Sequence, residues 1–302
     1  MANQTETSVF QIHRRTKLRL EREALFLVLL VVSVVMAFPL LIVISTAIKP
    51  DSEMILSEFR MLPRTIQLSN FISAFDYGPW GRYYFNSVFV TVITVLGSLI
   101  LNSLAGFSFA RLRFPGRELI FFIFLVGMMV PYQSIVIPQF VILRSIPLAG
   151  GNNILGQGGQ GWLDSYWALI VPFLSGSFGI FLCRQFFLSI PKSLDEAARI
   201  DGARPVVMYI RIFLPLAKPV LATLAILKTA HTWNNFFYPL VMVSSPEMYT
   251  VQLALQQFHA QYTVEWNLLM AATLVSIIPM VIVFFAAQKH FVAGVATAGV
   301  KG

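Results

Sequence analysis

Long apolar runs separated by short polar segments dominate this chain. About 20 consecutive apolar residues in a helix cross a hydrocarbon layer of about 30 Å. Six runs meet that length: Ala24–Ala47, Asn86–Ala110, Leu119–Leu143, Tyr166–Phe187, Val220–Val243 and Leu268–Gln288. The pattern therefore predicts an all-α integral membrane protein with six transmembrane helices.

The first run follows a basic segment and has to be distinguished from a signal peptide. It is longer than the apolar part of a signal peptide, and no small-residue cleavage site follows it. We therefore expect it to be retained as a span.

Nearly every run contains a proline, and each proline removes a backbone hydrogen bond and favours a kink. We interpret them as structural bends, the alternative being a role in alternating access. They are Pro39, Pro131, Pro138, Pro172, Pro239 and Pro279.

Composition and charge agree with a membrane protein and orient it. Hydrophobic residues make up 57% of the chain and charged residues 12%, against about 25% charged in soluble domains. With the N-terminus inside, cytoplasmic segments hold 16 of the 22 Lys and Arg and external segments five, with Lys228 inside a run. The positive-inside rule then predicts two cytoplasmic termini. We expect a tail at 1–23, a membrane domain at 24–289 and a tail at 290–302.

The runs lack the residues that a self-sufficient transporter or membrane enzyme needs. All 14 Asp and Glu lie outside them, whereas ion-coupled transporters hold carboxylates at membrane depth. The four histidines form no HExxH pair, the single cysteine is Cys183, and no GxSxG motif occurs. We expect no catalytic residue, no metal site and no cofactor, so the energy for any pumping must come from a partner. A secondary transporter or a membrane enzyme is the less favoured alternative.

The polar segment 189–219 is the most structured of the cytoplasmic loops. Ser193 and Glu196 have the spacing of a capping box, in which each side chain bonds the other residue's amide. Gly202 suits a left-handed helix stop. The segment predicts a short capped helix, a turn, and a second helix from about Arg204 to Leu214.

The same loop carries a spaced motif. Glu196-Ala197-Ala198 is followed after three residues by Gly202, and after nine more by Ile212-Phe213-Leu214-Pro215. This resembles the EAA motif, EAA-x3-G-x9-I-x-L-P, of permease subunits of bacterial binding-protein-dependent ABC importers. Further matching positions are Ser45-Thr46, Lys49, Asn70-Phe71, Asn86-Ser87, Ala110-Arg111, Phe114, Gly116, Trp233-Asn234, Pro239-Leu240 and Gly299–Gly302. Together they resemble the maltose-type carbohydrate permeases.

That resemblance implies a type I ABC importer permease fold in a bacterial plasma membrane. It implies a second homologous permease, a cytoplasmic ATPase dimer that binds the ATP, and an extracytoplasmic solute-binding protein, with no nucleic acid. The substrate would be a sugar or oligosaccharide. Another small solute, such as glycerol phosphate, an amino acid or an osmolyte, is the alternative within the same class.

The resemblance also assigns roles in the loop. Glu196 would pair with a basic group of the ATPase, and Ala197 and Ala198 would allow close approach. Gly202 would make the turn. The residues that would anchor the second helix beneath the bundle are Ile212, Leu214 and Pro215.

The fifth run is the most polar of the six. Trp233, Asn234, Asn235 and Tyr238 supply the amides, hydroxyl and aromatic rings with which proteins bind sugars. We interpret them as candidate substrate-pathway residues, the alternative being bonds to neighbouring helices. For Lys228 we favour a side chain that reaches back to the cytoplasmic interface over a pathway role.

Overall fold

The computed structural model describes residues 2–54, 60–258 and 264–299, with side chains described for residues 21–54, 60–258 and 264–287. Within those ranges the chain forms helices and loops and no strand, which confirms the all-α prediction. By length and composition, four helices can cross a membrane, or six if each of two bent helix pairs is one span.

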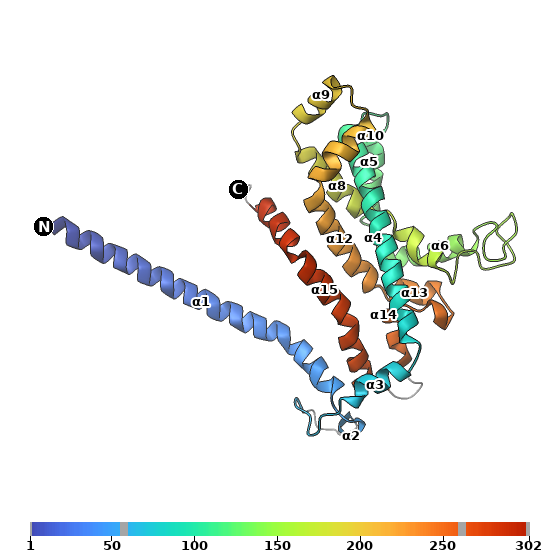
Figure 1. Ribbon diagram of the computed structural model, residues 1–302, viewed down its shortest axis with the longest axis horizontal. Coiled ribbons are helices and arrows are strands. Elements are labelled where there is room, and N and C mark those ends of the chain that lie inside the picture. Colours follow the sequence, from blue (N-terminus) through green and yellow to red (C-terminus); the bar gives the residue numbers. More distant parts are fainter. Residues whose placement is uncertain (1, 55–59, 259–263, 300–302) are drawn as a thin grey trace. The chain divides into compact units, whose positions relative to one another are not determined.

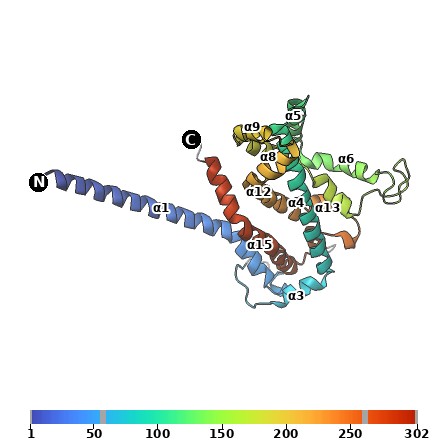
Figure 2. The same ribbon diagram turned by 45° about the horizontal axis from the view of Figure 1, so that its top comes forward.

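The helices fall in two compact units, Met1–Asp76 with Phe258–Leu274 (unit 1) and Tyr77–Gln257 with Val275–Gly302 (unit 2). Figures 1 and 2 show the helices coloured along the chain, from blue at the N-terminus to red at the C-terminus. The longer helices are α1 (Ala2–Ala47), α4 (Trp80–Arg111), α5 (Arg117–Gly127), α6 (Tyr132–Arg144), α8 (Ser177–Ser189), α12 (Lys218–Trp233) and α15 (Trp266–Gly299). The shorter α-helices are α2 (Asp51–Met54), α3 (Ser69–Asp76), α7 (Tyr166–Ile170), α9 (Ser193–Ile200), α10 (Pro205–Met208), α11 (Leu214–Leu216), α13 (Phe237–Met242) and α14 (Val251–Ala254).

Unit 1 is organised by a buried amide. Asn70, at the start of α3, donates from its side chain to the carbonyls of Ala47 and Lys49, at 2.9 and 2.8 Å. Asn267 of α15 donates to the carboxylate of Asp51 at 2.5 Å. These bonds close the loop after α1, which itself begins at Ala2, so the predicted tail 1–23 is largely helical.

Three helices of unit 2, α4, α8 and α12, pack side by side (Figure 1). Close approach of α4 and α8 depends on a glycine: a Cβ added at Gly106 would lie 2.5 Å from Cβ of Cys183. Around this crossing a buried cluster, here called the inner cluster, joins α4, α8, α9, the segment between α9 and α12, and α12 itself. It includes Phe107, Cys183, Phe187, Ala198, Met208, Tyr209, Phe213, Ala217, Val220 and Leu224.

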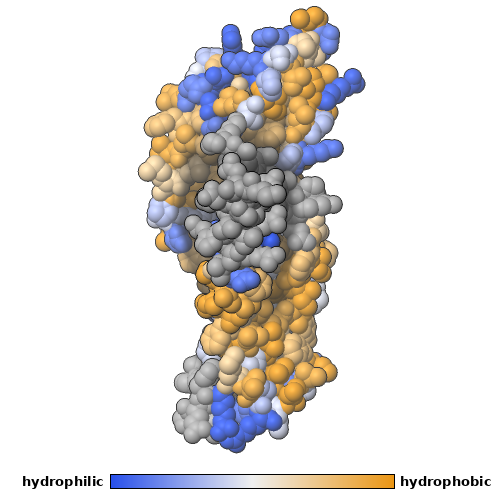
Figure 3. Space-filling view, turned by 90° about the vertical axis from the view of Figure 1, so that its left-hand side faces the viewer, coloured by the Kyte–Doolittle hydropathy of each residue, from blue (hydrophilic) through white to orange (hydrophobic). Residues whose placement is uncertain are grey.

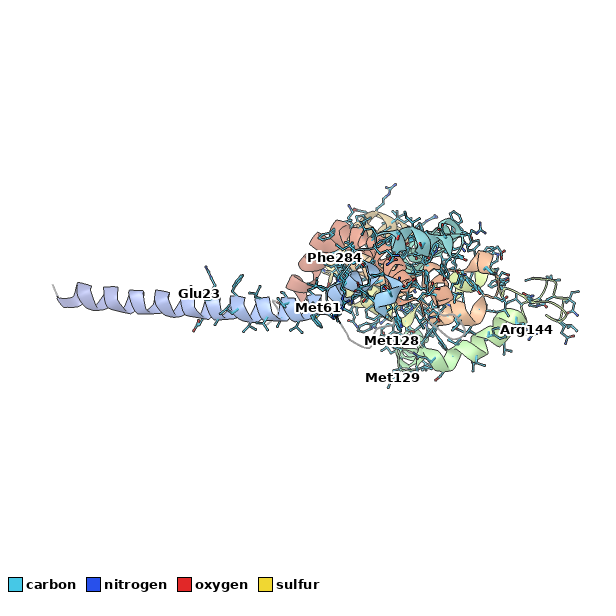
Figure 4. All side chains as sticks on the ribbon, turned by 90° about the horizontal axis from the view of Figure 1, so that it is seen from below. Glu23, Met61, Met128, Met129, Arg144 and Phe284 are labelled. Atoms are coloured by element: carbon cyan, nitrogen blue, oxygen red, sulfur yellow. The ribbon has the colours of Figure 1, made fainter. Side chains whose placement is uncertain are left out.

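The predicted third span, Leu119–Leu143, is not one straight helix. It breaks after α5 and resumes as α6 with a bend of 106°. Pro131 is the N-cap of α6, with ψ 129°. Proline has no amide for a helical bond and disfavours a helical conformation in the residue before it, so the run is interrupted here. Figure 4 shows Met128 and Met129 at the corner and Arg144 at the far end of α6.

The predicted fifth span, Val220–Val243, is also interrupted. Helix α12 ends at Trp233 and the next helix begins at Phe237. At its other end α12 meets the preceding helical segment, Pro205–Leu216, at 76°. Pro39 and Pro279, in contrast, lie inside continuous helices.

Candidate functional site

Helix α9 carries the first half of the motif, and it begins differently from the sequence prediction. Its N-cap is Lys192, whose carbonyl accepts from the amides of Asp195 (2.9 Å) and Glu196 (3.2 Å), and no side chain caps it. Ser193 is already the first helical residue, so the predicted capping box between Ser193 and Glu196 is wrong. The two carboxylates still lie in the first turn, where the helix dipole favours negative charge.

The end of α9 confirms the predicted turn. Gly202 has φ +73°, a left-handed conformation that glycine adopts without a Cβ penalty. Its amide donates to the Arg199 carbonyl at 3.0 Å, and the Ala203 amide donates to the Ala198 carbonyl at 2.9 Å. This pair of bonds is a Schellman motif, and it turns the chain into α10, which Pro205 opens.

A buried ion pair holds the inner side of α9. Arg111, the last residue of α4, donates to the carboxylate of Asp195 at 2.6 Å, and their side chains are 5% and 14% exposed. Its guanidinium also donates to the carbonyls of Phe187 and Ile190 and lies 5.0 Å from the Phe213 ring centroid. One side chain therefore joins α4, the end of α8 and α9.

Sequence reasoning missed Asp195. The available signal was a carboxylate in the first turn of the motif helix, next to Glu196 but about 100° around the helix from it. Its partner is 84 residues away in the chain, so no local pattern identifies the pair.

The outer side of α9 presents a mixed apolar and charged surface. Glu196 and Ala197 are exposed, and Leu194 and Ile200 are 38% and 86% exposed. Ala198 is buried in the inner cluster, so Ala197 is the one of the two motif alanines that is exposed. In Figure 3 hydrophilic and apolar groups mix at the upper end, where α9 and α10 lie.

The second half of the motif forms α10, a π-helix at Tyr209–Phe213 and α11, where one helix from about Arg204 to Leu214 was predicted. Ile212 and Leu214 pack against the inner cluster, while Pro215 is exposed. The Tyr209 hydroxyl lies 2.7 Å from the hydroxyl of Ser103 on α4. The segment is thus attached to α4 as well.

Three of the four candidate sugar contacts have partners within the fold. Trp233 is 5% exposed, and its indole N–H donates to a carbonyl of α15 at 3.1 Å. Tyr238 is 1% exposed, and its hydroxyl donates to a carbonyl of α7 at 3.2 Å. The side-chain oxygen of Asn235 accepts from the Tyr238 amide at 3.3 Å. Asn234 is exposed.

A cavity of about 410 Å³ lies between α4, α8 and α12. Its lining includes Ser98 and Asn102 of α4, Phe178 of α8, and Lys228 and His231 of α12. The ammonium of Lys228 lies 5.5 Å from the centroid of the ring of Phe173. That ring follows α7, so Lys228 does not extend back along α12 to the cytoplasmic end, as the sequence led us to expect.

The chain is similar to known proteins. Residues 102–297 match the family described as binding-protein-dependent transport system inner membrane component. The arabinooligosaccharides transport system permease protein of Halalkalibacterium halodurans is 32% identical over 90% of this chain and 93% of its own length. The sn-glycerol-3-phosphate transport system permease protein of Escherichia coli is 30% identical over 86% of this chain and 90% of its own.

A solved structure has the same fold. It is a bacterial ABC transporter involved in the import of the acidic polysaccharide alginate, and one of its chains superimposes with a TM-score of 0.75. That chain is 26% identical, and the match covers 90% of this chain and 97% of that one.

Proposed function

The chain belongs to the binding-protein-dependent transport system inner membrane component family, and from this we propose that it forms half of a translocation pathway for a sugar or oligosaccharide. It is the membrane subunit of an ABC importer, with the fold of such permeases. Two of the similar proteins named above are described with carbohydrates, and one with glycerol phosphate. Glycerol phosphate is therefore the second candidate substrate.

The partner on the cytoplasmic side is an ATPase dimer that binds the ATP. The observation that supports it is the two-sided character of α9. Its inner side is fixed by the Arg111–Asp195 pair, and its outer side exposes Glu196, Ala197 and Ile200. A short helix that is attached to the bundle on one side and exposes apolar and charged side chains on the other is suited to transmit movement of a bound ATPase to the spans.

The remaining partners complete the transporter. A second homologous permease would form the other half of the pathway, and a solute-binding protein would deliver the sugar from outside. In the topology that the sequence predicts, 16 of the 22 Lys and Arg lie in cytoplasmic segments, and this distribution supports cytoplasmic termini in a bacterial plasma membrane.

The test is coupling in the complete complex. Glu196→Ala removes the exposed carboxylate, and Gly202→Val forces a β-branched residue into a left-handed conformation. We expect both variants to lower ATP-dependent uptake at least about tenfold, with less ATPase retained on the purified permease. Glu23→Ala is the matched control, because Glu23 is an exposed carboxylate of α1 (Figure 4).

Two results would contradict the proposal. Full uptake and full ATPase retention in both variants would show that α9 does not couple the permease to the ATPase. Accumulation of sugar against a gradient in liposomes by the permeases without an ATPase would show that the chain is not a subunit of an ATP-driven importer.

A further inference from the structure

Lys228 places a positive charge at membrane depth. The cavity that it lines also includes Ser98 of α4, which lies roughly 20 Å from Arg111 at one end of that helix and about 27 Å from Trp80 at the other, at 1.5 Å per residue. The cavity is therefore near the middle of the span. Charged side chains at this depth are costly and mark functional positions.

Nothing in the described part of the chain neutralises this charge. The lining residues of the cavity include no carboxylate. The ammonium of Lys228 lies 5.5 Å from the centroid of the Phe173 ring, which carries no charge. An ammonium so placed favours binding of an anion.

The polar groups around Lys228 present donors to the cavity. Asn102 uses its side-chain oxygen to accept from the amide of Gly176 at 3.0 Å and the hydroxyl of Ser175 at 3.2 Å. Its NH2 group donates to the hydroxyl oxygen of Ser98 at 2.6 Å, which leaves the hydrogen of Ser98 directed elsewhere. The side-chain oxygen of Asn102 is thus already occupied as an acceptor. The donors that remain for a ligand are the hydroxyl hydrogen of Ser98, the second amide hydrogen of Asn102 and the ring of His231. Such a lining suits an oxyanion better than a neutral sugar hydroxyl.

We propose that this cavity binds an anionic group of the transported sugar, a carboxylate or a phosphate, so that the permease favours acidic over neutral carbohydrates. The proposal rests on the function proposed above and adds the substrate's charge. The cavity volume of about 410 Å³ is within the usual range for small-ligand sites. Lys228 supplies the charge, and Ser98, Asn102 and His231 supply hydrogen bonds.

The test uses the complete transporter, reconstituted in proteoliposomes with its ATPase, partner permease and binding protein. The probes are trigalacturonate, its methyl-esterified form, which has the same chain length without the charge, and glycerol 3-phosphate as the phosphate-bearing probe. Uptake of each probe by a variant is divided by uptake by the wild type. The contribution of the binding protein then cancels.

We expect Lys228→Met and Lys228→Gln to lower uptake of the anionic probe that the transporter imports, trigalacturonate or glycerol 3-phosphate, about tenfold or more. The reason is that the anion loses its charge-assisted hydrogen bond to the ammonium. Uptake of the esterified probe should stay within about twofold. Lys228→Arg should keep anionic uptake. Arg144→Met is the control, since it removes a positive charge at the end of α6, outside the cavity. Comparison of trigalacturonate with glycerol 3-phosphate then identifies the anion.

Three results would overturn the proposal. The first is an equal loss, or no loss, for charged and esterified probes. The second is a wild-type transporter that imports neutral sugars alone, which would leave the proposed function intact. The third is loss of the partner permease from the purified Lys228→Gln complex while the Lys228→Arg complex retains it. That result would show that Lys228 forms an ion pair with a carboxylate of the partner permease.

Discussion

Arg111 and Asp195 form an ion pair of 2.6 Å that joins the end of α4 to the first turn of α9. Both side chains are largely buried, and the same guanidinium bonds the carbonyls at the end of α8. A force on α9 is therefore transmitted directly to two long helices of unit 2. The motif helix acts as a part of the bundle and not as a flexible loop.

Asp195→Asn tests this connection. It keeps the shape of the side chain but leaves the buried Arg111 without its counter-charge, at a cost of about 2 kcal/mol or more. We expect a lower melting temperature of the purified complex and fewer sugars imported per ATP hydrolysed. Glu23→Gln, on the exposed surface of α1, should change neither quantity. Wild-type coupling in Asp195→Asn would contradict the connection.

Gly106 tests the contact between α4 and α8. In Gly106→Ala the added Cβ would meet Cβ of Cys183 at 2.5 Å and the amide nitrogen of Arg184 at 2.9 Å. We expect a loss of about 1–3 kcal/mol from overpacking, measured as a lower melting temperature in detergent. Gly81→Ala on the same helix is the matched control, because its Cβ meets nothing within 4 Å. Equal melting temperatures for Gly106→Ala and the wild type would show that α4 and α8 can move apart without a loss of stability.

The features that the sequence predicted correctly have local causes. The six apolar runs follow from composition, and the turn at Gly202 follows from a residue that suits a left-handed conformation. Pro131 indicated a bend before α6, but neither the size of that bend, 106°, nor the end of α12 at Trp233 was predicted. Hydropathy is continuous across both, so a window average does not reveal where the chain turns within a run.

The site was predictable where its parts are neighbours in the chain. The motif identified α9, but Asp195 acquires its role from Arg111, and Ala198 faces inward because of the inner cluster. The ammonium of Lys228 lies near the ring of Phe173, which lies on another segment. In each case the deciding contact is made by packing between segments distant in sequence.

Outside the membrane, the carboxylate of Asp164 accepts hydrogen bonds from Ser244 and Ser245. These bonds join two loops in a pH-dependent way. Burial alone would raise the pKa of its carboxyl, but hydrogen bonds from the hydroxyl and amide of Ser245 and the amide of Ser244 outweigh burial and lower that pKa. These hydrogen bonds to the ionised carboxylate therefore stabilise the fold above the ordinary pKa of about 4. The stabilisation is lost as pH falls through the lowered pKa.

We expect Asp164→Asn to lower the melting temperature at neutral pH, and the difference from wild type to shrink as pH falls below about 4. Ser245→Ala removes one of the donors and should give a smaller loss over the same pH range. A difference between Asp164→Asn and wild type that does not change with pH would show that the carboxylate charge is not what holds the loop.

Trp233 and Asn234 are adjacent in the chain but differ in surroundings, which separates a structural role from a substrate contact. Trp233→Phe removes a buried N–H···O bond to α15, so we expect a loss of about 1 kcal/mol with unchanged preference among sugars. Asn234→Ala removes an exposed amide, so its melting temperature should stay at the wild-type value while the sugar concentration for half-maximal uptake rises. Melting curves with uptake titrations check both. A changed sugar preference in Trp233→Phe at wild-type stability would reverse the assignment, because the indole would then act on the substrate.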